Sequence, residues 1–198
     1  MPYRNHPKLT ATQMSSLLQA VGDYLEDGGA TACILVVGGA VLVLRGWVER
    51  STQDIDVIAM RLPASAELLP PEFQAPLVDA IQRVALDRGL PADWLNTAVA
   101  MQWRTGLPPT LDSDIEWRTF AGLQVGLAGR QAMLALKLFA ATDRGPDSVH
   151  CRDLLVLAPT DAELEAAAAW VRTQDAAAEW PGLVTEVIEH VRIHRHVR

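Results

Sequence analysis

The sequence has few of the features that mark secreted, metal-cluster or membrane proteins. Its 198 residues include two cysteines, Cys33 and Cys151, too few for a disulfide framework or a cysteine metal cluster. The five histidines do not show the paired spacing of a zinc site. The longest apolar run, from Ala32 to Leu44, contains two glycines and is too short to span a membrane. The amino-terminal sequence MPYRNHPKLT has no apolar secretion segment, so we expect a cytoplasmic protein without a membrane partner.

Positive charge is also scarce. Lysine and arginine number 17 against 24 acidic residues, a net charge of −7, which argues against a broad nucleic-acid footprint. A local basic tail remains at the carboxyl end, where His190, Arg192, His194, Arg195, His196 and Arg198 lie close together in sequence. With 49% hydrophobic and 21% charged residues, the composition is that of an ordinary globular protein with one sizeable core.

The most informative stretch runs from Ala32 to Ile58. Residues 32–37 are apolar and rich in β-branched side chains, and they end at Gly38 and Gly39, which predicts a buried strand followed by a turn. Residues 40–48 have apolar side chains at helical spacing. A second strand is predicted to begin at Asp54, and its alternation places Asp54 and Asp56 on one face.

This arrangement has specific chemistry. Two ionised carboxylates a few ångströms apart repel each other unless a cation lies between them, and oxygen ligands of this kind suit Mg²⁺ together with substrate phosphates. Gly38 and Gly39 have no side chains, so their backbone can approach an anion closely. The pattern is neither a Walker loop nor a dinucleotide fingerprint, because no Gly-Lys-Ser/Thr follows and the three-glycine spacing is absent. It indicates phosphoryl or nucleotidyl transfer.

The order strand, Gly-Gly, helix and Asp-Ile-Asp resembles the signature of the DNA polymerase β-type nucleotidyltransferase superfamily. The fuller string from Gly39 and Ala40 through Gly46, Arg50 and Thr52 to Asp54–Asp56 is similar to bacterial minimal nucleotidyltransferases that include abortive-infection toxins. A later segment also matches that group, with Leu134–Leu138 around Lys137, then Arg144, then Asp153-Leu154. The matching positions span about residues 30–157.

The resemblance implies an α/β fold, a mixed sheet flanked by helices, that moves a nucleoside monophosphate from a nucleoside triphosphate to an acceptor. It implies that Asp54 and Asp56 hold Mg²⁺, with two ions plausible, that Gly38 and Gly39 bind the triphosphate, and that Lys137 offsets phosphate charge. The acceptor could be RNA such as tRNA, a protein or a small molecule. The toxin members also imply an antitoxin protein as a partner.

Members of this superfamily usually carry a third acid on a strand beside the Asp pair. Asp114 and Glu116 are the candidates, because both lie in an alternating segment. Asp153 is expected to serve as the partner of Lys137 or of an arginine, since a lysine on an apolar helix stripe must find a counter-charge or reach solvent.

Two other functions fit the same residues. Asp-x-Asp also marks metal-dependent glycosyltransferases that use nucleotide sugars, although the Gly-Gly helix favours nucleotidyl transfer. A non-catalytic module of the same fold, which binds a nucleotide or a partner without turnover, is the main alternative.

The rest of the chain predicts a two-part organisation. A capping box at Thr10 and Gln13 opens an amphipathic helix to about Glu26, and one at Thr160 and Glu163 opens an alanine-rich helix to about Thr173. Residues 77–87 are expected to form a helix that ends at Gly89. Residues 114–120 and 123–127 alternate as a hairpin that extends the sheet, whereas residues 91–109 show no clean period. We expect a nucleotidyltransferase-like core over 1–129 and a helical part over 130–198.

Overall fold

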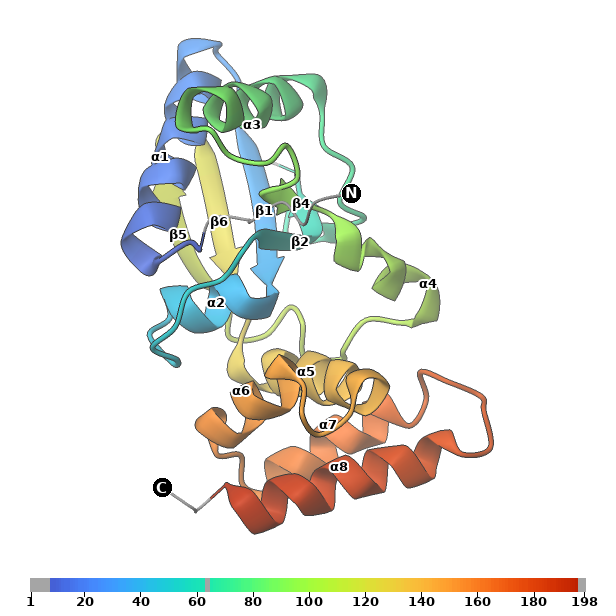
Figure 1. Cartoon of the computed structure of the whole chain (residues 1–198). Coiled ribbons are helices and arrows are strands. Elements are labelled where there is room, and N and C mark those ends of the chain that lie inside the picture. The colour runs from blue at the N-terminus through green and yellow to red at the C-terminus, as the bar shows by residue number, and fades with distance from the viewer. Residues whose placement is uncertain (1–7, 63–64, 196–198) are drawn as a thin grey trace, which may run out of the picture. The chain divides into compact units, whose positions relative to one another are not determined.

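The protein is a mixed α/β protein whose carboxyl-terminal region is helical (Figure 1). The structure, a computed structural model, describes residues 8–62 and 65–195. Contacts divide these residues into two units. Unit 1 comprises the described residues up to Trp103 together with Ile115–Leu127, and unit 2 comprises Arg104–Asp114 and the described residues from Ala128 onward. The expected boundary at Gly129 lies two residues beyond the division after Leu127, whereas residues 104–114 belong with the helical unit.

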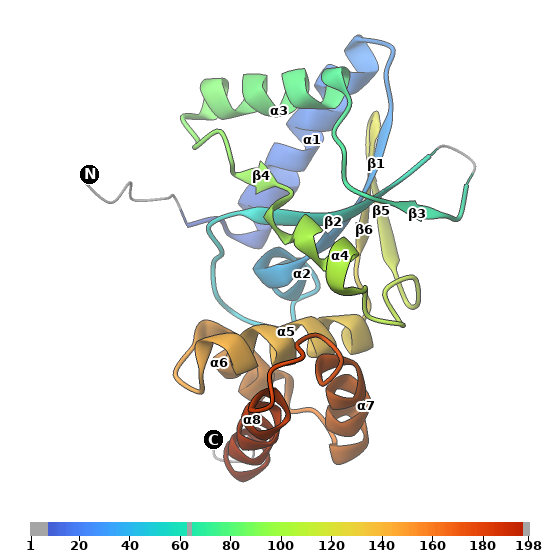
Figure 2. The same ribbon diagram turned by 90° about the vertical axis from the view of Figure 1, so that its right-hand side faces the viewer.

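A six-stranded mixed sheet forms the centre of unit 1 (Figure 2). Its strand order is β3-β2-β1-β6-β5, and β4 also pairs with β2. Pairs β1–β6 and β2–β4 are parallel, and the other pairs are antiparallel. The strands are β1 (Ala32–Val37), β2 (Ile55–Arg61), β3 (Leu68–Leu69), β4 (Leu95–Asn96), β5 (Glu116–Phe120) and β6 (Leu123–Leu127).

The predicted strand at 32–37 and the predicted hairpin are confirmed. The capping box at Thr10 is confirmed too, and it opens α1 (Ala11–Asp27). Helix α2 (Gly38–Leu44) begins and ends earlier than the expected 40–48, because the chain turns at Gly46 with φ 69°. Helix α3 (Ala75–Arg88) ends at the left-handed Gly89. The unassigned residues 91–109 contain β4, a 3₁₀ turn η1 (Ala98–Met101) and the short α4 (Gln102–Thr105).

A β-bulge in β2 decides which side chains share a face of the sheet. Leu35 pairs with Ala59, but the next residue, Val36, pairs with Val57, so Ile58 is the extra residue. The carbonyl oxygen of Ile58 accepts a hydrogen bond from the indole Nε1 of Trp103 at 2.6 Å. An extra residue shifts the side-chain alternation by one position. Residues before and after the bulge that would otherwise point to opposite faces therefore point to the same one.

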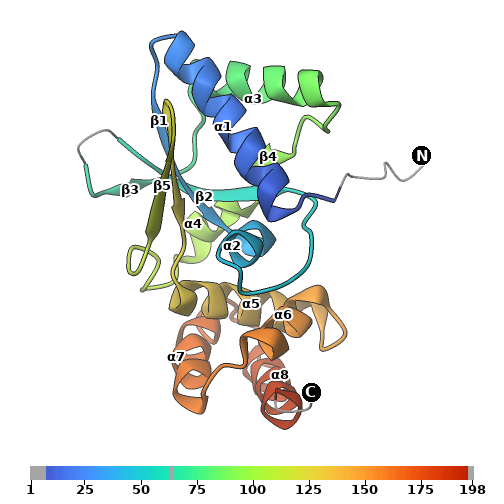
Figure 3. The same cartoon turned by 90° about the vertical axis from the view of Figure 1, so that its left-hand side faces the viewer.

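We call the face that carries Asp56 the Asp face. The strand pairings place these residues on it with Asp56: Leu35, Val37, Ala59, Arg61, Trp117, Gln124 and Gly126. The opposite face is covered by α1, which contacts β5 and β6, and by α2, which contacts β1 and β2 (Figure 3). Its side chains, among them Ile34, Val36, Val57, Val125 and Leu127, are fully buried. The core of unit 1 therefore lies between the sheet and these helices.

Unit 2 is built around α5. Helices α5 (Arg130–Arg144), α6 (Val149–Leu157), α7 (Asp161–Val171) and α8 (Trp180–His194) pack on one another. The predicted capping box at Thr160 and Glu163 is confirmed at the start of α7. Phe139 meets the rings of Trp170 and Trp180 edge-on at centroid distances of 6.0 and 5.8 Å. None of the described helices is both long and apolar enough to cross a membrane.

Candidate functional site

The Gly-Gly turn and Asp56 come together in unit 1, where β1 ends and β2 begins. Gly38 follows β1 directly, and Val37 pairs with Asp56 across β1 and β2. A Cβ atom added to Gly38 would lie 2.6 Å from Oδ2 of Asp56, and Gly38 has φ 76°. Both features require glycine at this position. The carboxylate of Asp56 therefore lies directly against the backbone of the turn.

Gly39 brings two further side chains to the same place. A Cβ atom on Gly39 would lie 2.7 Å from Oγ1 of Thr52 and 3.2 Å from a terminal nitrogen of Arg50. Thr52 is buried, and its backbone forms a two-way bridge with Leu9, with N···O distances of 2.6 and 3.0 Å. The loop that carries Arg50 and Thr52 is thus held against the glycine turn.

The site consequently contains a cation that sequence reasoning did not assign. Arg50 stands in the segment that resembles the minimal nucleotidyltransferases, but its role was not predicted. Its Nη1 donates to the carbonyl oxygen of Ser51 at 2.9 Å, while another terminal nitrogen is the one that approaches Gly39. The signal in the sequence was its spacing, since Arg50, Thr52, Asp54 and Asp56 follow one another at every second position.

Protein-family models, curated proteins and solved structures were compared with the chain. None of them matches.

Asn96 stands beside Asp56 on the neighbouring strand. Strand β4 pairs in parallel with β2, which places Asn96 next to Asp56 and Leu95 next to Ile55. The side chain of Asn96 stabilises its own loop. Its Oδ1 accepts a hydrogen bond from the N–H of Ala98 at 2.8 Å, and its Nδ2 donates to the backbone carbonyl oxygen of Asp93. An amide, and not a carboxylate, thus stands beside Asp56 on the neighbouring strand.

Glu116 is not placed to act as the third acid. It lies on β5, three strands from β2, so about 14 Å of sheet separates it from the Asp pair. It also points to the opposite face, because it pairs with Leu127, which pairs with Val36. There it forms ion pairs with Arg118 at 2.6 Å and Arg45 at 3.8 Å.

The expectation that Asp114 lies in a strand is wrong. It belongs to unit 2 and precedes β5, and it adopts the left-handed conformation with φ 53°. It packs against Gly129, because a Cβ atom added to Gly129 would lie 3.0 Å from the Cβ atom of Asp114. Aspartate tolerates this conformation better than most residues. The position is explained by a turn in the chain and gives no support for a metal-binding role.

Lys137 has a counter-charge inside unit 2. Its Nζ lies 2.7 Å from Oδ2 of Asp153, and the two residues are only 4% and 2% exposed. The expected partnership with Asp153 is confirmed. A buried pair of this kind offsets two desolvated charges, so the ammonium group has a structural role whether or not it also meets a phosphate.

Asp54 and Asp56 carry oxygen donors of the kind that Mg²⁺ takes together with substrate oxygens. Asp54 and Asp56 are both half-buried, which leaves their carboxylates within reach of a ligand. Among residues 8–62 and 65–195, no group of three or more His, Cys, Asp or Glu side chains is arranged to hold a metal. Mg²⁺ is commonly bound through one or two carboxylates plus phosphates, and a second ion would depend on further donors from the substrate.

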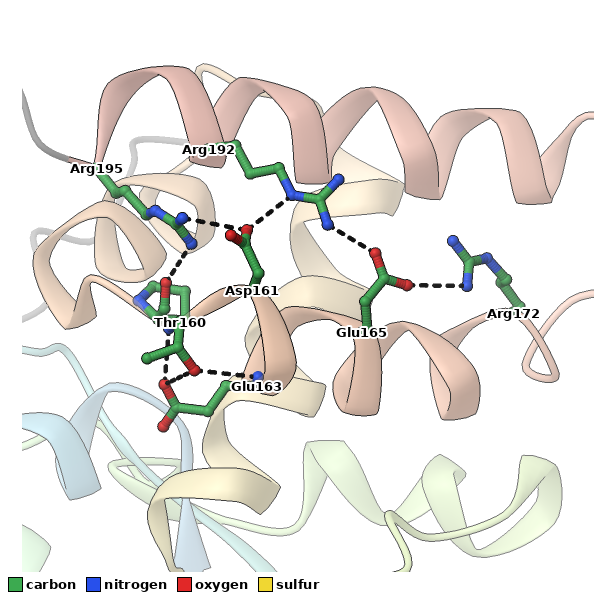
Figure 4. A network of polar contacts seen from close by, with 8 residues as sticks. Thr160, Asp161, Glu163, Glu165, Arg172, Arg192 and Arg195 are labelled. Carbon is green, nitrogen blue, oxygen red and sulfur yellow. Dashed lines mark hydrogen bonds and ion pairs between the residues drawn. The ribbon is translucent and has the colours of Figure 1, made fainter.

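The carboxyl-terminal arginines form ion pairs with acids (Figure 4). Arg192 contacts Asp161 at 3.0 Å and Glu165 at 2.7 Å, and Arg195 contacts Asp161 at 3.1 Å. Their hydrogen bonds hold the pKa of Asp161 below its ordinary value, with Arg195 the larger cause. These arginines tie α8 to α7. Arg198 and His196 lie outside the described residues.

Proposed function

We propose that the protein is a Mg²⁺-dependent nucleotidyltransferase that moves a nucleoside monophosphate from a nucleoside triphosphate to an acceptor. One observation carries the proposal. The carboxylate of Asp56 lies against the backbone of the Gly38 turn, so a triphosphate on the turn and a metal on the carboxylate would share one place.

The transfer requires four tasks from this chain. The backbone of Gly38 and Gly39 receives the phosphate oxygens, and Asp54 and Asp56 hold Mg²⁺. When bound, that ion neutralises charge that develops on the phosphates. Arg50, at the edge of the turn, supplies a fixed positive charge, which is the contribution expected of an arginine near a transferring phosphoryl group. Thr52 keeps the turn in register through its packing on Gly39.

The reaction balances without a further reactant. An acceptor oxygen forms a bond to the α-phosphorus, the bond from that phosphorus to the oxygen bridging to the β-phosphorus breaks, and pyrophosphate leaves. The acceptor proton passes to solvent. The residues described beside Asp56 include no third acid to take that proton, so an acceptor with a readily ionised group suits the site best.

The experiment is transfer of label from each of the four α-labelled nucleoside triphosphates, with Mg²⁺, to a cell lysate. Asp54→Asn and Asp56→Asn should each remove the transfer. Asp79→Asn, which changes an exposed aspartate on α3 of the same unit, should leave it intact. Transfer that survives Asp56→Asn would contradict the proposal.

The alternative is a module that binds nucleotide without turnover, and the amide at Asn96 is the observation that favours it. Stabilisation of the protein by triphosphate and Mg²⁺, without any transfer, would support this alternative. Stabilisation by nucleotide sugars alone would indicate a glycosyltransferase. If the protein is the toxin of a toxin–antitoxin pair, its expression should arrest growth and that of Asp56→Ala should not.

A further inference from the structure

A second polar feature lies on the Asp face of unit 1. The guanidinium carbon of Arg61 stands over the ring of Trp117 at 4.5 Å from its centroid. The other side of the ring rests on β6, because a Cβ atom on Gly126 would lie 2.8 Å from two of the ring carbons. The indole is thus held between a strand backbone and an arginine, and its side chain remains 37% exposed.

The guanidinium is fixed in orientation by a second contact. Nε of Arg61 donates to the carbonyl oxygen of Ser65 at 2.9 Å. Within residues 8–62 and 65–195, no hydrogen bond or ion pair is made by its two terminal nitrogens. A stacked and hydrogen-bonded arginine presents its remaining donors as a planar fork, which matches the geometry of a carboxylate or phosphate.

The bulge in β2 gives this arginine its position. Without the extra residue Ile58, Asp56 and Arg61 would point to opposite faces of the sheet; with it, they share the Asp face. Asp56 and Trp117 are three strands apart and two residues apart along the strands. Standard strand spacings put them about 16 Å from each other.

We infer that Arg61, supported by Trp117, binds an oxyanion group of the acceptor molecule. This inference rests on the proposed function and extends it to the substrate class. The acceptor carries a phosphate or a carboxylate that reaches the Arg61 guanidinium on the face of the sheet that also carries Asp56. The two anions share the same recognition by a guanidinium fork.

The other stacked arginines of unit 1 provide a contrast. Arg45, 4.9 Å from the ring centroid of Trp47, lies 3.8 Å from the carboxylate of Glu116. Arg83, 5.4 Å from the ring centroid of Tyr24, faces a tyrosine whose hydroxyl donates to Asp87 at 2.6 Å. Arg45 thus has a carboxylate within ion-pair distance inside the protein. Arg83 is exposed and lies in the same unit, so Arg83→Gln is a matched control for Arg61→Gln.

The test is a titration of the full-length protein with inorganic phosphate at constant ionic strength, followed by the indole N–H signals in NMR spectra. Trp117→Phe assigns the Trp117 signal. We expect that signal to shift to saturation in the wild type and in Arg83→Gln, and to lose at least 80% of the shift in Arg61→Gln. A parallel titration with acetate separates carboxylate from phosphate recognition. Absence of a saturable shift with both anions, or an equal shift in Arg61→Gln, would overturn the inference.

This measurement needs no turnover, so it stays informative if the nucleotidyl transfer fails. The link to the acceptor is tested separately with the labelled triphosphate and lysate. Arg61→Gln should raise about tenfold the amount of lysate that gives half-maximal transfer, while the triphosphate KM stays within twofold of the wild type. A rise in the triphosphate KM alone would place Arg61 on the donor side and contradict the assignment. The unchanged indole signals away from Trp117 report that the variant is folded.

Discussion

The two units use charged residues in opposite ways. In unit 2, acids and bases pair across helices: Lys137 with Asp153 in the interior, Arg130 with Glu163, and Arg192 with Asp161 at the surface. In unit 1, the half-buried carboxylate of Asp56 meets a backbone turn that has no side chains. The unit 2 pairs hold helices together, whereas Asp56 lies against the turn, in a unit where Glu116 also pairs with Arg118 and Arg45. The role of an aspartate in this protein therefore depends on how deeply it is buried and on which group lies next to its carboxylate.

The largest expected effects on stability and on transfer come from replacing one aspartate in each unit by asparagine. Asp153→Asn leaves the ammonium group of Lys137 buried without its counter-charge, and removal of one partner of such a pair typically costs about 3–5 kcal/mol. Asp56→Asn, at a half-buried position, should cost less stability than Asp153→Asn and should abolish transfer. Chemical denaturation and label transfer, measured on both variants, should give opposite patterns.

The double variant Lys137→Met/Asp153→Leu distinguishes a purely structural role of this ion pair from a role of Lys137 in phosphate binding. Replacing both charges by apolar side chains should recover most of the stability lost in Asp153→Asn. If it recovers stability and transfer together, Lys137 has no role in phosphate binding. If it recovers stability while transfer is lost, the predicted contact between Lys137 and phosphate is supported.

The next largest effect concerns the glycine turn. In Gly39→Ala the new methyl group meets Oγ1 of Thr52 at 2.7 Å, a clash that should cost about 1–3 kcal/mol and displace the turn. Thr52→Ala removes the opposing hydroxyl group and should restore part of the stability and of the transfer in the double variant. Equal losses in Gly39→Ala and in the double variant would show that the clash is not with Thr52.

Local patterns predicted much of the fold. The strand at 32–37, the hairpin and two capping boxes follow from alternation, burial and side-chain-to-backbone bonds within a few residues. The bulge at Ile58 could not be predicted, because it depends on how two strands separated by a helix choose their register. The short β4 was missed because its residues have no period of their own and are ordered by pairing with β2.

The residues of the candidate site could be predicted from the sequence where they belong to a single motif. Gly38, Gly39, Asp54 and Asp56 form one supersecondary unit, so their convergence follows from the strand–helix–strand order. Strand context alone points to Glu116 as a third acid, but it reveals neither the face of the sheet on which Glu116 lies nor its distance from Asp56 across the strands. Arg61 and Trp117 are 56 positions apart in the chain and meet only through the sheet order and the bulge.

A smaller effect is expected at the start of α7 in unit 2. Glu163 accepts hydrogen bonds from Arg130 and from Thr160, and these lower its pKa to about 2, with Arg130 the largest cause. Glu163→Gln keeps the capping box but loses the ion pair, and Glu163→Ala loses both. We expect the alanine variant to lose about 1–2 kcal/mol and the glutamine variant less.

The pH dependence of this loss has a definite sign. The folded pKa of Glu163 lies below its ordinary value of 4.5, so the ionised carboxylate stabilises the folded state above pH 4.5 and that contribution disappears as the pH falls toward 2. The stability difference between the wild type and Glu163→Gln should shrink across this window. A difference that stays constant down to pH 2 would show that the charge of Glu163 is not what matters.

The smallest expected effect concerns the exposed network between α7 and α8 (Figure 4). Arg192→Gln removes contacts to Asp161 and Glu165, but ion pairs at the surface contribute little because water and salt screen them. Asp161 also keeps its hydrogen bond from Arg195, the larger cause of its lowered pKa. The melting temperature should therefore fall only slightly, and the difference should vanish in about 1 M salt, where the screening length is about 3 Å. A large fall in melting temperature that persists in high salt would mean that the aliphatic part of the Arg192 side chain stabilises unit 2 by packing. In that case the contribution of Arg192 would come from apolar contact and not from its charge.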